Sequence, residues 1–527
     1  MPLPELPNPT SAALIKTACR KQPDAVMASD SEQALTGSEL WHRVQAAGME
    51  FQNLGIRKGN LAALLCGSSV NHAVAFFACL QIGVIPCCLH VRETRNRNRE
   101  NLALLQPKLL LADADNFAEA QALLKETGDL KLIELGALPT DCSESFPPPK
   151  VLPDDPALLL LSSGTTGRPK CILHSQRTLA ATARYGPHSY GCWSSSDSTV
   201  VFMQPSFAAW IHTVLPFIAI GGRVVFGGKF SAEGFLQTLE SERITLAPLV
   251  PTLWRMVLTA NPSAYDLSTV KTAFFSGEPG SADLVSVLRA EICPNVMTAY
   301  LASEGGCASA VVADAAILSG SGQAASTGLP APDAEVRVID PEGAISDELS
   351  HGEVGEIALK SASLAVGYWG DPEQTKQRFS GGWWRSGDLG FLDENGLLFV
   401  KGRLDNRINT GGVKVHAEAV EAALLQHPEV QLAAVVGEPD ETWGQRVEAH
   451  LVTKTKSVAA QEVLDFCLEN DLIPKSFLPK VVHFHDHLPT GPTGKLYRRG
   501  LRGAVHPTKP MSSYESPDHQ CGDGALR

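Results

Sequence analysis

The amino-acid sequence predicts an α/β protein with a large N-terminal domain and a small C-terminal α/β domain. The chain has 527 residues, and at roughly 150 residues per domain this length corresponds to about three folding units. Helical patterns alternate with short apolar runs over most of the chain, whereas from Glu335 the pattern becomes strand-like. We therefore expect the large domain to consist of two α/β subdomains plus a β-rich subdomain.

The first α/β subdomain is indicated by amphipathic segments separated by short apolar runs. Helices are expected at residues 37–54 and 71–82, and strands at 61–65 and 108–112. Alternation of this kind is typical of largely parallel sheets with helices on their faces. The second α/β subdomain runs from Pro156 to about Ala310, with strands expected at 200–203, 223–226 and 271–275.

Strand-like segments separated by glycine-rich turns define the β-rich subdomain, at residues 336–339, 356–360 and 397–400. After Gly402-Arg-Leu-Asp405 a compact α/β pattern begins, with helices expected at 417–426 and 460–469 and a strand at 433–436. We place the domain boundary at Asp405. The predicted domains are residues 10–404 and 405–505, and the proline- and serine-containing tail, residues 506–527, is expected to be disordered.

Composition and charge exclude several classes of protein. Hydrophobic residues make up 44% and charged residues 19%, which is typical of a folded, soluble chain. The 44 basic and 57 acidic residues give 44 − 57 = −13, so we expect no general attraction to nucleic acid or anionic membranes. The N-terminal residues show no secretory signal pattern, and we expect a cytoplasmic protein.

The least polar stretch and the cysteines indicate neither a membrane protein nor a secreted one. Residues 61–91 are interrupted by glycine, asparagine, histidine and proline, whereas a spanning helix needs about 20 mainly apolar residues. We therefore expect no integral membrane association. The 12 cysteines include no CxxC pair, so reduced, mostly buried thiols are expected.

The segment Leu161-Ser-Ser-Gly-Thr-Thr-Gly-Arg-Pro-Lys170 carries the strongest functional signal. It follows an apolar run, and a strand that leads into a loop of glycine and hydroxyl residues lets backbone N–H groups approach phosphate oxygens. Arg168 and Lys170 add positive charge. A Walker A loop is excluded, because Pro169 separates Gly167 from Lys170. A flexible turn without a ligand is the alternative interpretation.

Five further segments follow in order: Ser276-Gly-Glu-Pro279, Tyr300-Leu-Ala-Ser-Glu304, Trp384-Arg-Ser-Gly-Asp388, Gly402-Arg-Leu-Asp405 and Pro489-Thr-Gly-Pro-Thr-Gly-Lys495. Together with the glycine-rich segment they resemble the motifs of the adenylate-forming superfamily. That superfamily contains AMP-dependent acyl- and aryl-CoA synthetases and ligases, carrier-protein adenylation domains and beetle luciferases. The resemblance covers about residues 10 to 500. It implies an N-terminal AMP-binding domain, a hinge and a small mobile C-terminal lid.

The resemblance implies a reaction in two steps that share one site. A carboxylate attacks the α-phosphate of ATP to give an acyl-adenylate and pyrophosphate, and a thiol then displaces AMP. ATP, Mg²⁺ and CoA are the implied cofactor and cosubstrates. Between the steps the lid is expected to rotate about Asp405, which withdraws Lys495 and presents Gly411 and Gly412. Those two glycines would bind CoA, because positions without a side chain let the pantetheine arm pass close to the backbone.

Residue roles follow from the same resemblance. The implied catalytic residues are Lys495, Glu304 and Arg403. The Lys495 ammonium would stabilise charge that builds on the α-phosphate, and Glu304 would hold Mg²⁺, which prefers carboxylate oxygen. Asp388 would accept both ribose hydroxyls. The implied ATP- or AMP-binding residues are Ser162, Ser163, Gly164, Thr165, Thr166, Gly167, Lys170, Gly277, Glu278, Pro279, Tyr300, Ser303, Asp388, Arg403 and Lys495.

Three positions depart from the family pattern. Ser303 replaces a threonine but keeps the hydroxyl group. Leu301 stands where the family has glycine, and Cys171 stands where it usually has glycine. Leu301 adds bulk beside the expected acyl pocket and therefore bears on the size of the substrate.

The acyl pocket is expected after the strand at 200–203 and in the segment around Tyr300, with Phe207, Ala208, Trp210, His212 and Ala302 as lining residues. Amino-acid-activating relatives place an aspartate where this chain has Ala208, and no Asp or Glu occurs from residue 198 to 232. A free α-amino acid would bury an unpaired ammonium group, so we predict an acyl or aryl acid. In the competing interpretation, the aromatic residues and His212 belong to the hydrophobic core.

The predicted function is ATP-dependent activation of a carboxylic acid and its transfer to CoA. An acyl carrier protein is the alternative thiol partner, and a luciferase-like or non-catalytic relative is the remaining alternative. Retention of Lys495, Glu304 and Asp388 argues against an inactive enzyme.

Two weaker patterns point to other ligands. A glycine-rich stretch from Gly320, with Asp340 about 20 positions on, imitates a dinucleotide-binding fingerprint, but two prolines break the helix that this fingerprint requires. Three alternating histidines could place imidazoles on one strand face near a metal ion, although a strand end before Pro489 is the favoured interpretation: His483, His485 and His487.

Overall fold

The computed structural model of the chain describes residues 9–127, 130–141, 147–162, 169–277, 280–306, 311–313, 326–455, 458–489, 496, 498–502 and 514–515. The chain forms two compact units: unit 1 is Met1–Gly352, Ala358–Ser386 and Leu392–Phe399, and unit 2 is Glu353–Ile357, Gly387–Phe391 and Val400–Arg527. Among the described residues no helix is long and apolar enough to cross a membrane. The nine described cysteines are buried and free.

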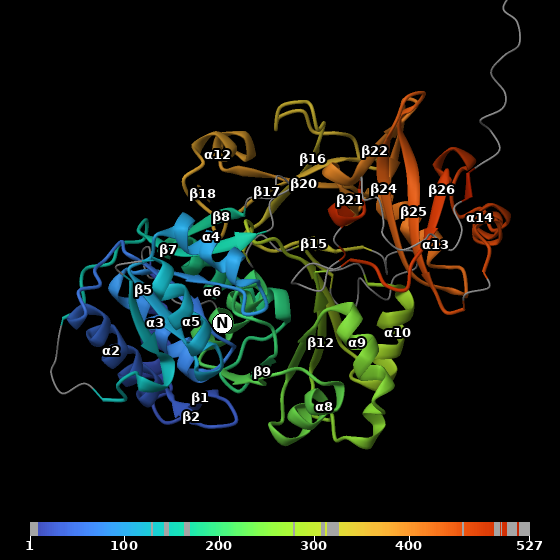
Figure 1. Cartoon of the computed structure of the whole chain (residues 1–527). Coiled ribbons are helices and arrows are strands. Elements are labelled where there is room, and N and C mark those ends of the chain that lie inside the picture. The colour runs from blue at the N-terminus through green and yellow to red at the C-terminus, as the bar shows by residue number, and fades with distance from the viewer. Residues whose placement is uncertain are drawn as a thin grey trace, which may run out of the picture. The chain divides into compact units, whose positions relative to one another are not determined.

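One large sheet of unit 1 has seven strands in the order β18-β8-β7-β4-β3-β5-β6 (Figure 1). The strands from β7 to β6 run parallel, whereas β8 and β18 are antiparallel to their neighbours. Parallel strands covered on both faces are continuous apolar runs, and most of these fit that pattern. Their bounds are β3 (Leu61–Leu65), β4 (Ile85–Cys88), β5 (Leu109–Ala112), β6 (Lys131–Glu134), β7 (Pro156–Ser162), β8 (Lys170–Ser175) and β18 (Gly367–Tyr368).

The second large sheet of unit 1 has nine strands in the order β15-β14-β13-β12-β11-β9-β10-β1-β2. Its central strands, from β13 to β1, are parallel, and β2, β14 and β15 pair antiparallel at the edges. The bounds are β1 (Val26–Ser29), β2 (Ala34–Thr36), β9 (Ser198–Val201), β10 (Arg223–Phe226), β11 (Leu246–Leu249), β12 (Thr272–Ser276), β13 (Val296–Tyr300), β14 (Val311–Ala313) and β15 (Leu329–Pro330).

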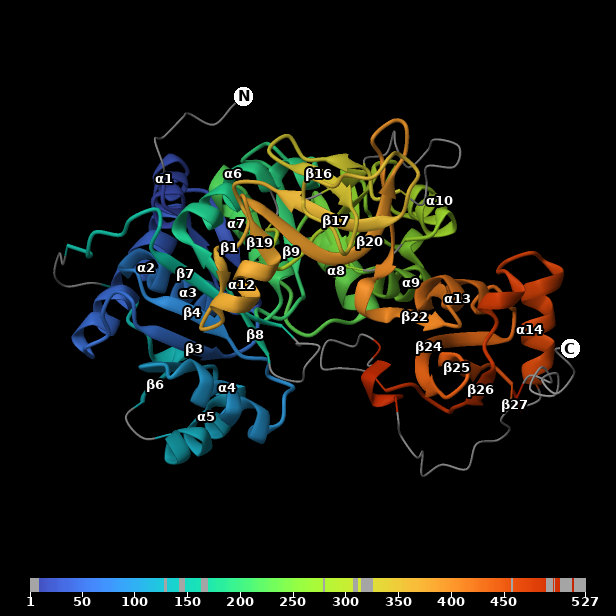
Figure 2. The same cartoon turned by 90° about the horizontal axis from the view of Figure 1, so that it is seen from above.

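Helices fill the space between these two sheets and cover their outer faces (Figures 1 and 2). One hydrophobic core joins strands of both sheets to α1 (Ser11–Lys21), α2 (Gly37–Asn53), α3 (Val70–Ile82), α6 (Gln176–Tyr190) and α7 (Ala208–Ile220). The outer faces pack on α4 (Arg95–Leu105) and α5 (Ala114–Thr127) for one sheet and on α8 (Ala232–Ser241), α9 (Pro251–Thr259) and α10 (Ala282–Glu291) for the other. Helix α3 is apolar around its circumference, as a helix between two layers must be.

A five-stranded sheet follows, with the order β16-β17-β20-β19 and with β21 paired to β20. Strands β17 and β20 contribute residues to both units. The bounds are β16 (Glu335–Ile339), β17 (Gly355–Lys360), β19 (Phe379–Ser380), β20 (Trp383–Leu392) and β21 (Leu398–Arg403), and the short helix α12 is Pro372–Arg378.

The rest of unit 2, in its described residues, is a six-stranded sheet with two α-helices. The strand order is β23-β22-β25-β26-β27, and β24 also pairs with β25. One face packs on the helices, and the other carries a smaller apolar cluster that contains Val436, Val452 and Leu488. The bounds are β22 (Arg407–Thr410), β23 (Val413–His416), α13 (Ala417–Leu424), β24 (Val430–Asp440), β25 (Gly444–Thr453), α14 (Ala460–Glu469), β26 (Val481–Phe484) and β27 (Tyr514–Glu515).

The predicted α/β fold is confirmed, and most elements lie where the sequence pattern placed them. The strand predicted at 433–436 is the clearest difference, because β24 extends over Val430–Asp440. Its ends are held by antiparallel pairing with β25, for example Glu438 beside Arg446. Backbone hydrogen bonds to a neighbouring strand thus continue beyond the apolar run that the sequence reveals. Within the predicted tail, Tyr514–Glu515 pair antiparallel with β26.

Candidate active site

The glycine-rich segment connects two antiparallel strands of unit 1. Strand β7 ends at Ser162 and β8 begins at Lys170, and these residues are partners in the strand ladder. The Lys170 Nζ atom lies 5.5 Å from the centroid of the Tyr368 ring, a cation–π contact. The strand pairing therefore holds the Lys170 ammonium group at the start of β8, where the loop ends. The predicted phosphate-binding residues of the loop lie outside the described residues: Ser163, Gly164, Thr165, Thr166 and Gly167.

Tyr368 also contacts the predicted magnesium ligand, Glu304. Its hydroxyl group donates a 3.0 Å hydrogen bond to Glu304 Oε1, and the Ala365 N–H donates to the Glu304 carbonyl oxygen at 2.7 Å. Burial raises the pKa of Tyr368, and the nearby Glu304 charge raises it further. The phenol therefore stays protonated and remains a hydrogen-bond donor. The segment at β18 thus fixes both the backbone and the side chain of Glu304.

The predicted adenine-side residues follow two neighbouring parallel strands. Strand β12 ends at Ser276 and β13 ends at Tyr300, with Ser276 beside Ala299 in the ladder. Gly277 has φ +87°, in the left-handed region that glycine adopts without strain. Open α/β sheets bind ligands beyond the carboxyl ends of their strands, and this geometry is compatible with the prediction. Glu278 and Pro279 lie outside the described residues.

Buried His174 contacts the Ser303 segment and lies near a second buried histidine, His212. His174 Nε2 is 2.8 Å from the Ser303 carbonyl oxygen, and its Nδ1 is 3.2 Å from Thr178 Oγ1. Burial lowers the pKa of His174 to about 4, against the opposing effect of the Ser303 bond. Burial and then the neighbouring His174 lower the pKa of His212 to about 3. Both rings are neutral at pH 7, and His174 can donate one N–H to the Ser303 carbonyl.

No sequence pattern indicated a role for His174 or Tyr368. His174 is 129 positions from Ser303, and Tyr368 is 64 positions from Glu304. No local spacing connects residues so far apart, because only the packing of β8 and β18 brings them to this segment.

Trp210, one of the predicted acyl-pocket residues, is a core residue in this structure. It is 0% exposed, and its indole Nε1 donates to Ser68 Oγ at 2.8 Å. Its ring packs against Phe76, with centroids 5.4 Å apart. His212 is buried on the same helix. These two positions agree with the competing interpretation of the sequence, in which they serve packing.

Phe207, Ala208 and Ala302 form the partly exposed group among the predicted acyl-pocket residues. Phe207 precedes α7, and Ala208 is the first residue of that helix. The Phe207 ring lies edge-on to His90, with centroids 5.2 Å apart. These three residues are the accessible members of the predicted pocket.

The predicted ribose ligand Asp388 is paired with Arg403 within unit 2. Asp388 lies on β20 and Arg403 ends β21, and the Asp388 Oδ1 and Arg403 Nη1 atoms are 3.0 Å apart. The Asp388 side chain is 9% exposed and that of Arg403 is 53% exposed, so the pair is open to solvent on the arginine side. The Gly387 N–H donates to Glu356 Oε1 at 2.9 Å, which fixes the strand beside the aspartate.

The predicted hinge residue Asp405 lies in the 3₁₀ turn Leu404–Asn406. Before the turn, Gly402 has φ +148°, and a Cβ atom at this position would lie 2.4 Å from Glu418 Oε2. Asn406 Nδ2 donates to Glu418 Oε1 at 2.6 Å. Glycine at 402 therefore lets the turn lie against α13, and the Asn406 bond fastens it there.

Gly411 and Gly412, the predicted CoA-binding residues, form the turn between β22 and β23. Their φ angles are +57° and +84°, as two-residue hairpin turns require. A Cβ atom at Gly411 would lie 2.4 Å from Trp443 Cε3, whereas one built at Gly412 would have no atom of the described residues within 4 Å, its chain neighbours aside. Packing against Trp443 thus requires glycine at position 411, which no sequence pattern indicated, and Gly412 leaves open space beside the backbone.

The chain following the predicted catalytic lysine is anchored to α13. Arg498 donates to both carboxylate oxygens of Glu421, from Nε at 2.9 Å and from Nη2 at 2.6 Å. The Val435 N–H donates to Glu421 Oε1 at 2.8 Å. Bidentate pairs of this kind are strong and specific in geometry. Lys495 lies outside the described residues.

Comparison with known proteins agrees with these motifs. The family model of the AMP-binding enzyme matches residues 15–369, and that of the AMP-binding enzyme C-terminal domain matches residues 419–495. The chain belongs to the AMP-binding enzyme family. Feruloyl-CoA synthase from Amycolatopsis sp is 30% identical to this AMP-binding enzyme over 497 residues, which cover 92% of this chain and 96% of the relative.

Two further comparisons extend this result. The fatty acid–[acyl-carrier-protein] ligase ScoC from Streptomyces coeruleorubidus is 29% identical over 483 residues, which cover 89% of this chain and 91% of the relative. The structure of o-succinylbenzoate CoA synthetase (MenE) from Bacillus subtilis with OSB-AMP has a TM-score of 0.84 at 24% identity and covers 95% of this chain and 99% of that chain. The second likeness shows that the fold is shared.

Membership of the AMP-binding enzyme family confirms the predicted adenylate-forming superfamily and the acid–thiol ligase class. ATP, Mg²⁺ and CoA, the predicted cofactor and cosubstrates, are the groups that AMP-binding CoA ligases use. The described residues fit these groups chemically: Glu304 offers a carboxylate to a hard cation, and Asp388 offers one to paired hydroxyl donors.

Proposed function

We propose that this AMP-binding enzyme joins an acyl or aryl carboxylic acid, not a free α-amino acid, to the thiol of CoA through an acyl-adenylate. The observation that carries the proposal is the segment after β9, where no Asp or Glu occurs from residue 198 to 232. Ala208 lies at the partly exposed start of α7. An α-ammonium group would find no carboxylate from this segment, and burying an unpaired charge is costly.

The accessible residues of the predicted pocket support the same choice of substrate. Phe207, Ala208 and Ala302 are apolar and partly exposed. An uncharged aromatic or aliphatic group is the ligand that such surroundings favour.

Charged side chains have proposed roles in the first step. Glu304 would hold Mg²⁺, which supplies positive charge to the phosphates when bound. Lys170 and Arg403 would add positive charge near the nucleotide, and Asp388 would accept the ribose hydroxyls. Lys495 would bridge the substrate carboxylate and the α-phosphate as negative charge develops. The 15 residues implied to bind ATP or AMP retain their predicted roles within this proposal.

The second step has two candidate acceptors. We favour CoA, which the name of feruloyl-CoA synthase gives as the acceptor of that relative. An acyl carrier protein is the second candidate, because the similarly related ScoC is a fatty acid–[acyl-carrier-protein] ligase. In either case Gly411 and Gly412 would admit the pantetheine arm, after the C-terminal domain (residues 405–505) has turned about Asp405.

The experiment that tests the proposal measures pyrophosphate release from Mg-ATP with hexanoate, benzoate and a set of α-amino acids. Each reaction is run with and without CoA, and thioester products are detected by mass spectrometry. Release with hexanoate or benzoate and formation of the corresponding acyl-CoA are expected. Greater activity on an amino acid contradicts the substrate class. Release of pyrophosphate without consumption of CoA would favour an acyl carrier protein as the thiol acceptor.

The role of Lys495 is tested separately in the two steps. Lys495→Ala is expected to slow adenylation by on the order of 100-fold or more, as for loss of one preorganised electrostatic group. Thioester formation from pre-made acyl-adenylate is expected to continue at the wild-type rate. Lys475→Ala, which removes an exposed lysine of the same domain, is the matched control. Equal loss in both steps would contradict the proposed alternation of the C-terminal domain.

A further inference from the structure

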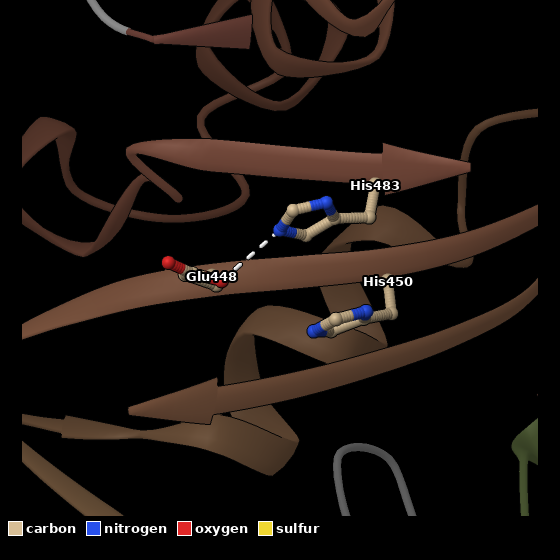
Figure 3. A group of neighbouring side chains, drawn as sticks. All are labelled: Glu448, His450 and His483. Carbon is tan, nitrogen blue, oxygen red and sulfur yellow. Dashed lines mark hydrogen bonds and ion pairs between the residues drawn. The ribbon is translucent and has the colours of Figure 1, made fainter. Parts of the chain in front are cut away.

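A carboxylate and three imidazoles gather on one face of the unit 2 sheet. Strands β25 and β26 are parallel neighbours, and His450 lies beside His483 in their ladder. Glu448 precedes His450 by two positions and His485 follows His483 by two, and alternate residues of extended chains share one face. Figure 3 shows Glu448, His450 and His483 on these two strands, with the Glu448 carboxylate directed at the His483 ring.

The side-chain atoms of this cluster lie at distances suited to one metal ion. Glu448, His450 and His483 each offer one ligand atom, and these three atoms lie within 4.8 Å of one another. Two of these atoms, His483 Nε2 and Glu448 Oε2, are 3.0 Å apart. Ligand bonds of about 2.0 to 2.1 Å in a tetrahedral zinc site place ligand atoms roughly 3.3 Å apart. Small side-chain rotations would therefore bring all three atoms to one ion.

We propose that Glu448, His450 and His483 form a binding site for a transition-metal ion of the zinc class. Imidazole nitrogen combined with carboxylate oxygen suits zinc, cobalt or nickel, whereas Mg²⁺ and Ca²⁺ prefer oxygen ligands alone. With three protein ligands, a fourth position is left for water or a further ligand. In the described part of the chain this is the one group of three or more such side chains that meets the distance requirement.

His485 supplies the contact that orients a metal-binding histidine. Its Nε2 atom lies 2.9 Å from His450 Nδ1. A ligating histidine usually donates its second ring N–H to a hydrogen-bond acceptor, which fixes the ring and its tautomer. A His450 Nδ1–H donated to His485 Nε2 directs the Nε2 atom of His450 to the metal. His485 is therefore a positioning residue in the proposed site.

The cluster is open to solvent on the His483 side. Glu448 is 5% and His450 is 1% exposed, whereas the His483 side chain is 22% exposed. Arg446 Nε donates to Glu448 Oε1 at 2.6 Å, which directs the other oxygen toward His483.

The same face of the sheet contacts the chain on both sides of Lys495. Val436, the ladder partner of Glu448, packs in one apolar cluster with Leu488, and Leu496 packs against this cluster. A metal ion that joins β25 to β26 would therefore reduce motion where the segment 489–495 begins and ends. This consequence does not depend on the proposed function.

The binding site is tested by calorimetric titration of the untagged full-length protein with Zn²⁺ in excess Mg²⁺, which occupies oxygen-only sites. One Zn²⁺ per chain is expected. His485→Gln is expected to weaken binding by about 10-fold, as for loss of an orienting contact, and His450→Gln and His483→Gln by more. His487→Gln is the matched control, because this exposed histidine of the same segment lies outside the group of ligands; its affinity should equal that of the wild type.

Two further measurements keep the test decisive. Circular dichroism identifies a variant that has failed to fold, and His483→Gln, at the partly exposed position, is the variant best placed to fold normally. Hydrogen exchange in the peptides that flank segment 489–495 should slow on addition of Zn²⁺ in the wild type but not in His483→Gln. Absence of stoichiometric Zn²⁺ binding, or equal affinity in the wild type and the folded His450→Gln and His483→Gln variants, would overturn the proposal and leave a hydrogen-bonded network.

Discussion

Three buried histidines make unit 1 sensitive to acid. His72, His174 and His212 are 0%, 1% and 3% exposed, and burial lowers their pKa values to about 3, about 4 and about 3. A histidine in the unfolded chain titrates near about 6.5. Below that pH the unfolded chain binds more protons than the folded one, so the free energy of unfolding falls as pH falls.

The expected size of the effect follows from these pKa values. Each histidine that stays neutral in the folded state lowers the free energy of unfolding by about 1.4 kcal/mol for each pH unit below its unfolded pKa. Between pH 6.5 and 5.0 this amounts to about 2 kcal/mol for each histidine and about 6 kcal/mol for three. Domain stabilities are about 5 to 15 kcal/mol. The contribution of each histidine to the free energy of unfolding is fully present above its unfolded pKa. It is lost as pH falls from that value to the folded pKa.

His72→Phe isolates one histidine. His72 lies edge-on to Trp210, with ring centroids 4.6 Å apart and an interplanar angle of 81°, and phenylalanine keeps an aromatic ring that cannot be protonated. Relative to the wild type, the variant should gain about 2 kcal/mol of stability as pH is lowered from 6.5 to 5.0. The assay is hydrogen exchange in denaturant, read in the α3 peptide Val70–Ile82.

The control for this experiment is His351→Gln, which changes an exposed histidine of unit 1. Its stability relative to the wild type should not depend on pH over the same range. Other titrating groups affect the wild type and the His72→Phe variant equally, so they cancel in the difference. A difference between the His72→Phe variant and the wild type that is constant from pH 6.5 to 5.0 would refute the reasoning.

Three further predictions concern the site. Tyr368→Phe removes the hydrogen bond to Glu304 but keeps the ring. It should raise the KM for Mg²⁺ in adenylation about 10-fold, because a hydrogen bond to a charged group is worth about 1.5 to 3 kcal/mol. An unchanged Mg²⁺ dependence would disprove this. Arg498→Leu leaves the Glu421 carboxylate buried without its cation and should destabilise unit 2 by about 3 to 5 kcal/mol. The free energy of unfolding is measured by hydrogen exchange in α13. A loss below about 1 kcal/mol would contradict this prediction. In Gly411→Ala the added Cβ atom meets the indole ring of Trp443, and the variant should slow thioester formation more than adenylation. Equal slowing of both steps would argue against a role of Gly411 in thioester formation.

The sequence by itself determined the fold class, because helix and strand periodicities are local properties of the chain. It also determined the family, because each motif consists of residues that are close together in the sequence. The glycine-rich segment before Lys170, the Tyr300 to Glu304 segment and the turn at Asp405 could all be recognised without coordinates. Their order along the chain made the assignment specific, and the family comparison confirmed it.

Only the tertiary structure decided which side chains meet across the sheets. Tyr368 reaches Glu304, His174 reaches the Ser303 carbonyl, and Arg498 reaches Glu421. These partners are 64 to 129 positions apart. Strand register and helix packing set such distances, and both result from many apolar contacts at once, which no local pattern records.

The histidines of unit 2 show the same limit. The sequence indicated an alternating row that included His483, but it assigned no role to Glu448 or His450, which lie 35 and 33 positions earlier. Parallel pairing of β25 with β26 places His450 beside His483. Likewise, no sequence pattern shows how deeply Trp210 is buried, whereas the structure places its side chain in the core between the two sheets. Sequence patterns indicate what chemistry a residue can perform, whereas packing decides what it can reach.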